Sequence, residues 1–374
     1  MSNGSLTSLD LAPKKPDTSK GFHPQLALTV EILRPAREAL RFDGVLEGSV
    51  LGPQIHRFLL DWARLRNVYS SSKMEGSPIR LDDAHRVLQA GKAEKPQEEE
   101  VLRLSRAYSA IHASRRFDPL TVDAIVSLHG QLFTGLLEEE DAPGRLKTAR
   151  NGVWDDAIAG YVFEATPPKR TRAELRALLS WYYAEGQLLD PAVSAGLFFA
   201  EFQAIHPFLE GNGRLGRLLN QRLLRARGFE NVTLTAFDGI LFRRGRKYYE
   251  SLRATNKGSN YHVWLRFYAD CLRMAYKEAV TRGDLAPILT SVAGGCERDL
   301  LGWVLTSGLE WFRRANYPNA KGYAPVTISE ALASLHGRKL LERRGERRAA
   351  KYRLDEAFLS AVYARNAASS RATE

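Results

Sequence analysis

Twelve residues near the middle of the chain, HPFLEGNGRLGR from His206 to Arg217, combine side chains that can act together on a phosphate group. Pro207 disfavours a helical conformation at the residue before it, so we expect a helix to end near Ile205, with His206 at its end. Histidine titrates near neutral pH, which suits a general base. Glu210 adds a carboxylate of the kind that holds Mg²⁺.

The second half of this segment is typical of an anion site. Gly211, Asn212 and Gly213 tolerate unusual backbone dihedrals, so we expect a turn that leads directly into a helix. The free N–H groups at the start of such a helix form a cradle for phosphate. Arg214 and Arg217 share one face of its first turn, where each cation opposes the helix dipole at a cost of about 0.3–1 kcal/mol. The pattern therefore predicts a negatively charged ligand and a nucleotidyl- or phosphoryl-transfer site.

Taken singly, a Gly-Asn-Gly turn, a histidine at a helix end and two nearby arginines are common structural features. Together, the segment resembles the signature of the Fic-domain family, His-x-Phe-x-Asp/Glu-Gly-Asn-Gly-Arg-x-x-Arg, at every fixed position, and the similarity covers about residues 25 to 282. The family's usual activity is AMPylation, the transfer of AMP from ATP to a Ser, Thr or Tyr hydroxyl of a target protein. The resemblance therefore implies a protein adenylyltransferase, a nucleotidyltransferase that modifies a target and itself.

The resemblance also implies roles for individual residues. His206 would deprotonate the attacking hydroxyl, and Glu210 would hold Mg²⁺ between the α- and β-phosphates. Phe208 would pack in the core beneath the loop. A Tyr249 ring would stack on the adenine, and Asn256 would hydrogen-bond to it. The residues that the resemblance assigns to nucleotide binding are Gly211, Asn212, Gly213, Arg214, Arg217, Tyr249 and Asn256.

A second motif lies upstream. The segment SSKMEG, from Ser71 to Gly76, matches the family's inhibitory pattern Ser/Thr-x-x-x-Glu-Gly/Asn. By this resemblance Glu75 pairs with Arg217, which removes the arginine that should hold the γ-phosphate, so that ATP binds in an unproductive pose. The alternative is a solvated glutamate before a glycine that ends a helix.

Residues 148–168 contain glycines, prolines and β-prone side chains in an otherwise helical chain, and this pattern predicts a β-hairpin. The hairpin fits the family's flap, which aligns the hydroxyl-bearing segment of the target by β-strand addition. We expect Val162 and Phe163 to be flap residues. Lys147 stands where the family frequently has an arginine.

The remaining pattern is helical, because apolar residues recur at helical spacing between turn residues. We therefore expect an all-α fold: a Fic helical core with a small β-hairpin flap, an N-terminal helical segment and a C-terminal winged helix-turn-helix. The expected helices cover residues 26–40, 54–68, 101–114, 121–134, 172–188, 192–205, 214–227, 246–257, 261–281, 300–313 and 327–341. The expected domains are a disordered tail at 1–22, an N-terminal helical domain with the inhibitory motif at 23–95, the Fic core at 96–282 and the winged-helix domain at 283–374.

Length and composition limit the function classes. The 374 residues fit two or three domains, and the net charge of +11 indicates an anionic partner. The chain has no apolar run of about 18 residues and no apolar region in its first residues, so neither a membrane span nor a signal peptide is expected. Two cysteines are too few for a disulfide framework, which favours the cytoplasm. The His and Cys residues never fall at metal-ligand spacing, which argues against a structural zinc site.

From Arg338 to Arg353 the chain carries eight Lys or Arg and two Glu. A wing with this charge could contact the phosphate backbone of DNA, and a solvated basic face or a protein-docking surface is the alternative. The predicted partners are ATP, a target protein with a hydroxyl side chain, a second copy of the chain, and DNA. Two other functions stay open: a de-AMPylase at the same site, with Glu75 positioning water, and a winged-helix DNA-binding regulator with a vestigial Fic core.

Overall fold

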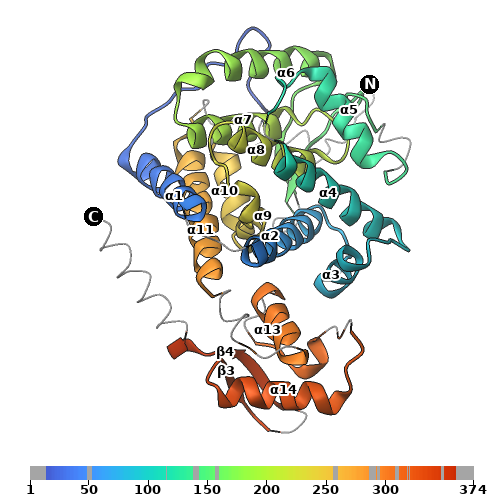
Figure 1. Ribbon diagram of the computed structural model, residues 1–374. Coiled ribbons are helices and arrows are strands. Elements are labelled where there is room, and N and C mark those ends of the chain that lie inside the picture. Colours follow the sequence, from blue (N-terminus) through green and yellow to red (C-terminus); the bar gives the residue numbers. More distant parts are fainter. Residues whose placement is uncertain are drawn as a thin grey trace.

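The computed structural model describes residues 14–48, 53–114, 116–137, 143–155, 160–255, 260–285, 292, 295–307, 311–317, 319, 321–346 and 349–358. Helices make up most of this part of the chain, and its strands form two short antiparallel hairpins (Figure 1). The expected helical fold with a hairpin flap is therefore confirmed. Among the described residues, no helix combines the length and the apolar character that a membrane crossing needs.

The elements follow one another along the chain. The helices are α1 Val30–Gly48, α2 Pro53–Met74, α3 Leu81–Ala90, α4 Pro96–Ala113, α5 Val122–Phe133, α6 Pro168–Tyr183, α7 Pro191–Ile205, α8 Asn212–Arg225, α9 Phe237–Arg243, α10 Gly245–Thr255, α11 His262–Leu285, α13 Cys296–Ser307 and α14 Pro325–Gly337. The strands are β1 Gly152–Asp155, β2 Gly160–Glu164, β3 Leu341–Arg344 and β4 Lys351–Leu354.

Most helices lie close to the ranges that the periodicity predicts, but α3 and α9 lie outside all of them. Helix α9 has seven residues, and those from Phe237 to Leu241 are all buried, so it is too short to show alternating buried and exposed faces. The helix predicted over 300–313 is shorter, because α13 ends at Ser307. Phe312 instead forms an antiparallel β-bridge with Tyr352.

Helix α7 lies within the larger apolar core and is buried on every side from Ala192 to Ile205. At its start, the Asp190 side chain accepts a hydrogen bond from the Ala192 N–H at 2.9 Å. A helix that is apolar all round must lie beneath others, and α6, α8 and α11 pack against it (Figure 1). Gly196 allows α11 to approach, because a β-carbon there would lie 2.8 Å from Cδ1 of Tyr268.

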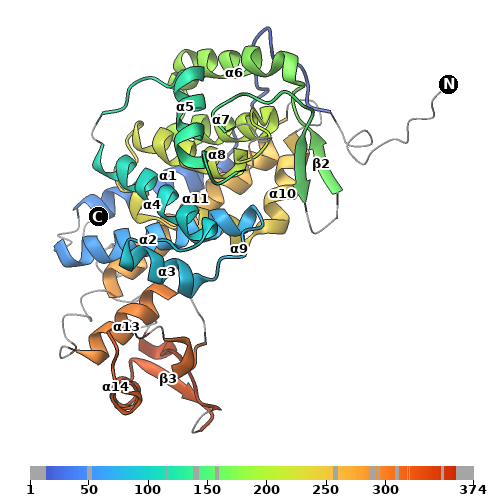
Figure 2. The same cartoon turned by 90° about the vertical axis from the view of Figure 1, so that its right-hand side faces the viewer.

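Residues 14–22, which we call the strap, differ from the predicted disordered tail. The strap lies against α6 and α7, and Figure 2 shows this blue segment passing close to α6 and the flap hairpin. Lys15 and Phe22 are buried. The Phe22 ring meets Trp181 and Tyr261 edge-on, with centroids 4.9 and 5.8 Å apart. The polar composition of this segment predicts disorder, but one buried lysine and one buried aromatic ring hold it against the helices.

The C-terminal elements α13, α14, β3 and β4 share a separate apolar cluster that includes Val292 (Figure 1). β3 and β4 pair on either side of Gly345, where the sequence predicts the wing. Arg344 and Arg353 lie over the Trp311 ring, 5.3 and 4.7 Å from its centroid. The domain boundaries, the winged-helix topology and the contact with DNA stay predictions.

Candidate active site

His206 lies directly after α7 in the left-handed conformation, at φ 49° and ψ 63°. Its Nδ1 is 3.0 Å from the carbonyl oxygen of Gln203, which can only accept, so Nδ1 carries the proton and Nε2 keeps a lone pair. Burial and the positive charge of Lys147 lower the pKa of His206 to about 4. The imidazole is therefore uncharged at neutral pH, in the tautomer that a general base at Nε2 requires.

The loop that joins α7 to α8 is held by a side-chain amide. Asn212 Oδ1 accepts a hydrogen bond from the Phe208 N–H at 2.9 Å, and Asn212 Nδ2 donates to the Phe208 carbonyl oxygen at 2.7 Å. The predicted turn is shorter than expected, because only Gly211 is left-handed, at φ 80°, and α8 begins at Asn212 instead of Arg214. A β-carbon at Gly211 would lie 2.6 Å from the Phe133 ring, so the loop packs closely on α5.

A second amide and a lysine hold the same loop from the flap side. Lys147 donates from Nζ to the Ile205 carbonyl oxygen and from its backbone N–H to the Pro207 carbonyl oxygen, both at 2.9 Å. Asn151 Nδ2 donates to the Phe208 carbonyl oxygen at 2.6 Å, and Asn151 Oδ1 accepts from Lys147 Nζ at 2.7 Å. The sequence singles out Lys147 but not Asn151. The base of the flap and the loop therefore form one hydrogen-bonded unit.

Arg217 is held by the end of α2. Its Nη2 is 2.8 Å from Glu75 Oε1 and donates to the Ser71 carbonyl oxygen at 3.0 Å. Its Nε donates to the Ser71 hydroxyl at 2.9 Å. The Glu75 carboxylate also lies on the start of α8, because a β-carbon at Gly213 would overlap it. Burial raises the pKa of Glu75, but the charges of Arg217 and Arg214 outweigh this effect and lower it. An ionised carboxylate therefore occupies the anion-binding end of the helix.

Arg214 has a carboxylate partner that the sequence does not predict. Its Nη1 is 2.6 Å from Glu100 Oε2, and Ser72 Oγ donates to Glu100 Oε1 at 2.6 Å. The Arg214 guanidinium also lies 4.8 Å from the centroid of the Phe133 ring. Glu100 is the last of three consecutive glutamates at the start of α4, and no local pattern distinguishes it from the other two. Both arginines of the motif are thus paired with glutamates.

Glu210 has an exposed side chain, and its carbonyl oxygen accepts a hydrogen bond from His129 Nε2 at 2.9 Å. The His129 ring stacks on Phe208 with centroids 3.8 Å apart, and the sequence does not predict this contact. Within the part of the chain that the structure describes, no three His, Cys, Asp or Glu side chains gather into a metal site. A single exposed carboxylate fits Mg²⁺, which usually takes its other ligands from phosphates and water.

Comparison with known proteins agrees with this arrangement. Residues 119–224 match the Fic/DOC family. Over 216 residues it is 26% identical to the protein adenylyltransferase Fic of Nematostella vectensis, and the match covers 56% of this chain and 47% of that protein. Over 105 residues it is 32% identical to a probable protein adenylyltransferase of Aquifex aeolicus, with 28% of this chain and 30% of that protein covered.

Solved Fic structures share the fold. A Fic family protein from Desulfovibrio desulfuricans G20 matches with a TM-score of 0.60 and 22% identity, over 90% of this chain and 99% of that one. Fic-1 from C. elegans matches with a TM-score of 0.54 and 20% identity, over 70% of this chain and 75% of that one. The chain spans less than half the length of the first curated relatives that it matches.

Beside the Fic motif, the predicted adenine and flap residues are placed only in part. Tyr249 on α10 is partly buried and packs against the apolar cluster of the hairpin, which includes Phe163. The Phe163 side chain is itself buried, so its ring supports the flap from within and does not face a docking target. The main chain of Val162 lies in β2. Asn256 lies outside the described residues.

We predict that His206 stays uncharged down to a pH of about 4, against an ordinary pKa of 6.5. Burial and the nearby Lys147 ammonium both disfavour the imidazolium ion, so protonation requires more acid. An NMR pH titration of the ring signals, assigned with His206→Asn, measures the midpoint. Lys147→Met should raise that midpoint, and a wild-type midpoint near 6.5 would contradict the charge state described here.

We also predict that Glu100→Gln binds ATP about tenfold more tightly than the wild type, a gain of about 1.4 kcal/mol. The substitution removes the carboxylate that competes with phosphates for Arg214 and keeps the shape of the side chain. Isothermal titration calorimetry with ATP measures the affinity. Glu99→Gln is the matched control, because Glu99 pairs with Arg103 at 2.9 Å. An equal gain in both variants, or no gain in Glu100→Gln, contradicts the competition.

Proposed function

We propose that the protein is an adenylyltransferase that transfers AMP from ATP to a hydroxyl side chain of a target protein and of the chain itself. The observation that carries this proposal is an uncharged His206, with Nε2 available, one short loop before a helix start that bears Arg214 and Arg217. The Fic domain and the names of the relatives support the same class of reaction.

In the proposed reaction, the hydroxyl oxygen of the target attacks the α-phosphorus of ATP. The bond from that phosphorus to the oxygen that bridges to the β-phosphate breaks, and pyrophosphate leaves. His206 Nε2 takes the hydroxyl proton. The N–H groups at the start of α8, together with Arg214 and Arg217, stabilise the negative charge on the phosphates. When bound, Mg²⁺ neutralises part of that charge, and Glu210 is the residue that would hold it.

The end of α2 restrains this reaction. Glu75 pairs with Arg217 at 2.8 Å and fills the space beside Gly213. Ser72 reaches Arg214 through Glu100. Ser72 and Glu75 are three residues apart at the same helix end, so one element acts on both arginines. In this proposal the phosphates of ATP must displace carboxylates before both arginines can bind them, and the resting protein is inhibited.

The flap supplies the docking edge for the target in this proposal, because an extended peptide can add to an exposed strand. The hairpin carries the main chain of Val162 and is joined at its base to the loop of His206 through Lys147 and Asn151. A docked hydroxyl would therefore be positioned by the same hydrogen-bonded unit that positions the base. The cytoplasmic location and a second copy of the chain as partner stay predictions from the sequence.

Removal of AMP from a modified target is a second candidate function. The Glu75 carboxylate lies close enough to His206 for each charge to influence the pKa of the other. A carboxylate in this place could orient water for attack on an AMP ester. The two functions differ in the effect of losing Glu75, which would release the transfer of AMP but abolish its removal.

We predict that Glu75→Gly raises the transfer of AMP at least about tenfold, because Arg217 is then free to bind phosphate. Incubation with α-labelled ATP and Mg²⁺, followed by measurement of label in the protein, tests this prediction. Adding His206→Ala to Glu75→Gly should lower the transfer by about 10²–10⁴-fold, the usual contribution of a general base. Glu185→Gly, at an exposed position, is the matched control.

The outcomes separate the candidates. Equal label with and without His206 would refute the assigned base. No increase in Glu75→Gly would refute the restraint. A protein already carrying AMP that loses it only when Glu75 is intact would favour removal over transfer.

A further inference from the structure

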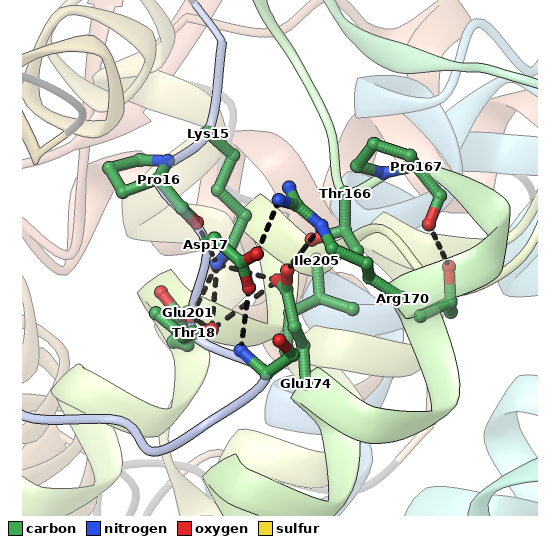
Figure 3. Close-up of polar contacts among 12 residues, drawn as sticks. Lys15, Pro16, Asp17, Thr18, Thr166, Pro167, Arg170, Glu174, Glu201 and Ile205 are labelled. Atoms are coloured by element: carbon green, nitrogen blue, oxygen red, sulfur yellow. Dashed lines mark hydrogen bonds and ion pairs between the residues drawn. The ribbon is translucent and has the colours of Figure 1, made fainter.

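The strap inserts one lysine between two buried carboxylates (Figure 3). Lys15 Nζ is 2.8 Å from Glu174 Oε2 on α6 and 2.7 Å from Glu201 Oε1 on α7. The side chains of these three residues are 1%, 0% and 3% exposed. Thr18 Oγ1 also lies 3.3 Å from Glu174 Oε2 and 2.9 Å from Glu201 Oε1. The strap is thus fastened to two helices by a buried charge.

The remaining partners of the two carboxylates do not replace Lys15. Glu174 also pairs with Arg170 at 3.2 Å. Glu201 accepts a hydrogen bond from the neutral Tyr261 hydroxyl at 2.8 Å. Without Lys15, Glu174 would keep Arg170, which also pairs with Asp17 at 2.7 Å, and the partners of Glu201 in this cluster would be the hydroxyls of Thr18 and Tyr261. An uncompensated buried charge is strongly destabilising. Lys15 therefore contributes to the stability of the folded protein.

The same strap extends the flap at its base. The Lys15 N–H donates to the Glu164 carbonyl oxygen at 3.0 Å, and Lys14 forms a parallel β-bridge with Glu164. Glu164 is the last residue of β2, and Gly152 of β1 pairs with it on the other side. The strap therefore adds one isolated bridge to the end of β2, at the point where the flap leaves the helical core.

The strap also contacts α7, the helix that ends at His206. Glu201 lies on α7, five residues before His206, and Lys15 joins this helix to α6. On the other side of the loop, Lys147 links the Ile205 carbonyl oxygen to the base of the flap. One segment therefore connects the helix that ends at the proposed base with the strand that would receive a target.

We propose that the strap is a positioning element of the active site and that Lys15 is its positioning residue. Lys15 clamps α6 to α7, and its main chain holds the end of β2, so that the flap keeps a fixed distance from His206. The strap acts on the docking of the hydroxyl-bearing segment and not on the nucleotide, because its contacts lie at the flap base and on α6 and α7. This effect on docking rests on the proposed function, whereas the effect on flap order does not.

Hydrogen–deuterium exchange tests the structural part directly. In Lys15→Met, the backbone amides of Gly160–Glu164 should exchange about tenfold faster or more, because they open locally once the strap is released. The amides of α4 and α5 should keep their wild-type rates. Lys15→Arg retains the cation and should restore most of the protection. Lys20→Met, at an exposed position of the same strap, is the matched control and should leave the flap unchanged.

Two results would overturn the proposal: unchanged exchange in the flap, or equally faster exchange in every helix. If Lys15→Met does not fold, Thr18→Val is the second test, since it removes the hydroxyl between Glu174 and Glu201 but leaves the charges in place. It should raise the exchange rates of the β2 amides a few-fold and leave those of the helices unchanged. Equally faster exchange in all elements of Thr18→Val would again overturn the proposal.

Measuring both self-modification and nucleotide affinity separates a positioning role of Lys15 from a merely structural one. In the Glu75→Gly background, Lys15→Met should lower self-modification with α-labelled ATP about tenfold and leave the affinity for a fluorescent ATP analogue unchanged. A parallel loss of nucleotide affinity would show a structural role only and would contradict the positioning role. If no variant transfers AMP, the proposed function fails, while the exchange measurement still decides the role of the strap.

Discussion

The site depends on a polar loop that reverses the chain inside an apolar core. The loop follows α7, which is buried on all sides, and its own backbone groups must find partners away from water. Those partners are side chains: the amides of Asn212 and Asn151, the ammonium of Lys147 and the ring of His129. Because these side chains come from α5, α8 and the flap base, the geometry of His206 depends on how these three parts pack together.

Charge is the second constraint, and it follows from the first. The loop leads into α8 with two arginines in its first turns, where the helix dipole already favours anions. In the folded protein these cations are buried, so each needs a carboxylate, and Glu75 and Glu100 supply them. The same carboxylates therefore occupy the two arginines that would bind phosphates in the proposed reaction. In that proposal, one set of contacts both stabilises the fold and restrains the site.

The strap applies the same physics at the outer end of the site. A lysine from the N-terminal segment neutralises two carboxylates that α6 and α7 bring together, and its main chain continues into a bridge with the flap. Buried ion pairs are seldom the most stabilising way to fill a core, but in some proteins they select one arrangement over others. Such specificity suits a segment that has to hold a hairpin in register with a distant side chain.

The sequence by itself determined the local backbone and the motif from which the chemistry is predicted. The helix end before Pro207 and the hairpin at 148–168 follow from preferences that act over a few residues, and the structure agrees with both. Only the tertiary structure decided which side chains complete the site. Glu100 meets Arg214 across 114 residues and Lys15 meets Glu174 across 159, and no local pattern marks either pair. The physical reason is that helical spacing encodes which face of a helix is buried, whereas the pairing of buried charges depends on how those faces are packed.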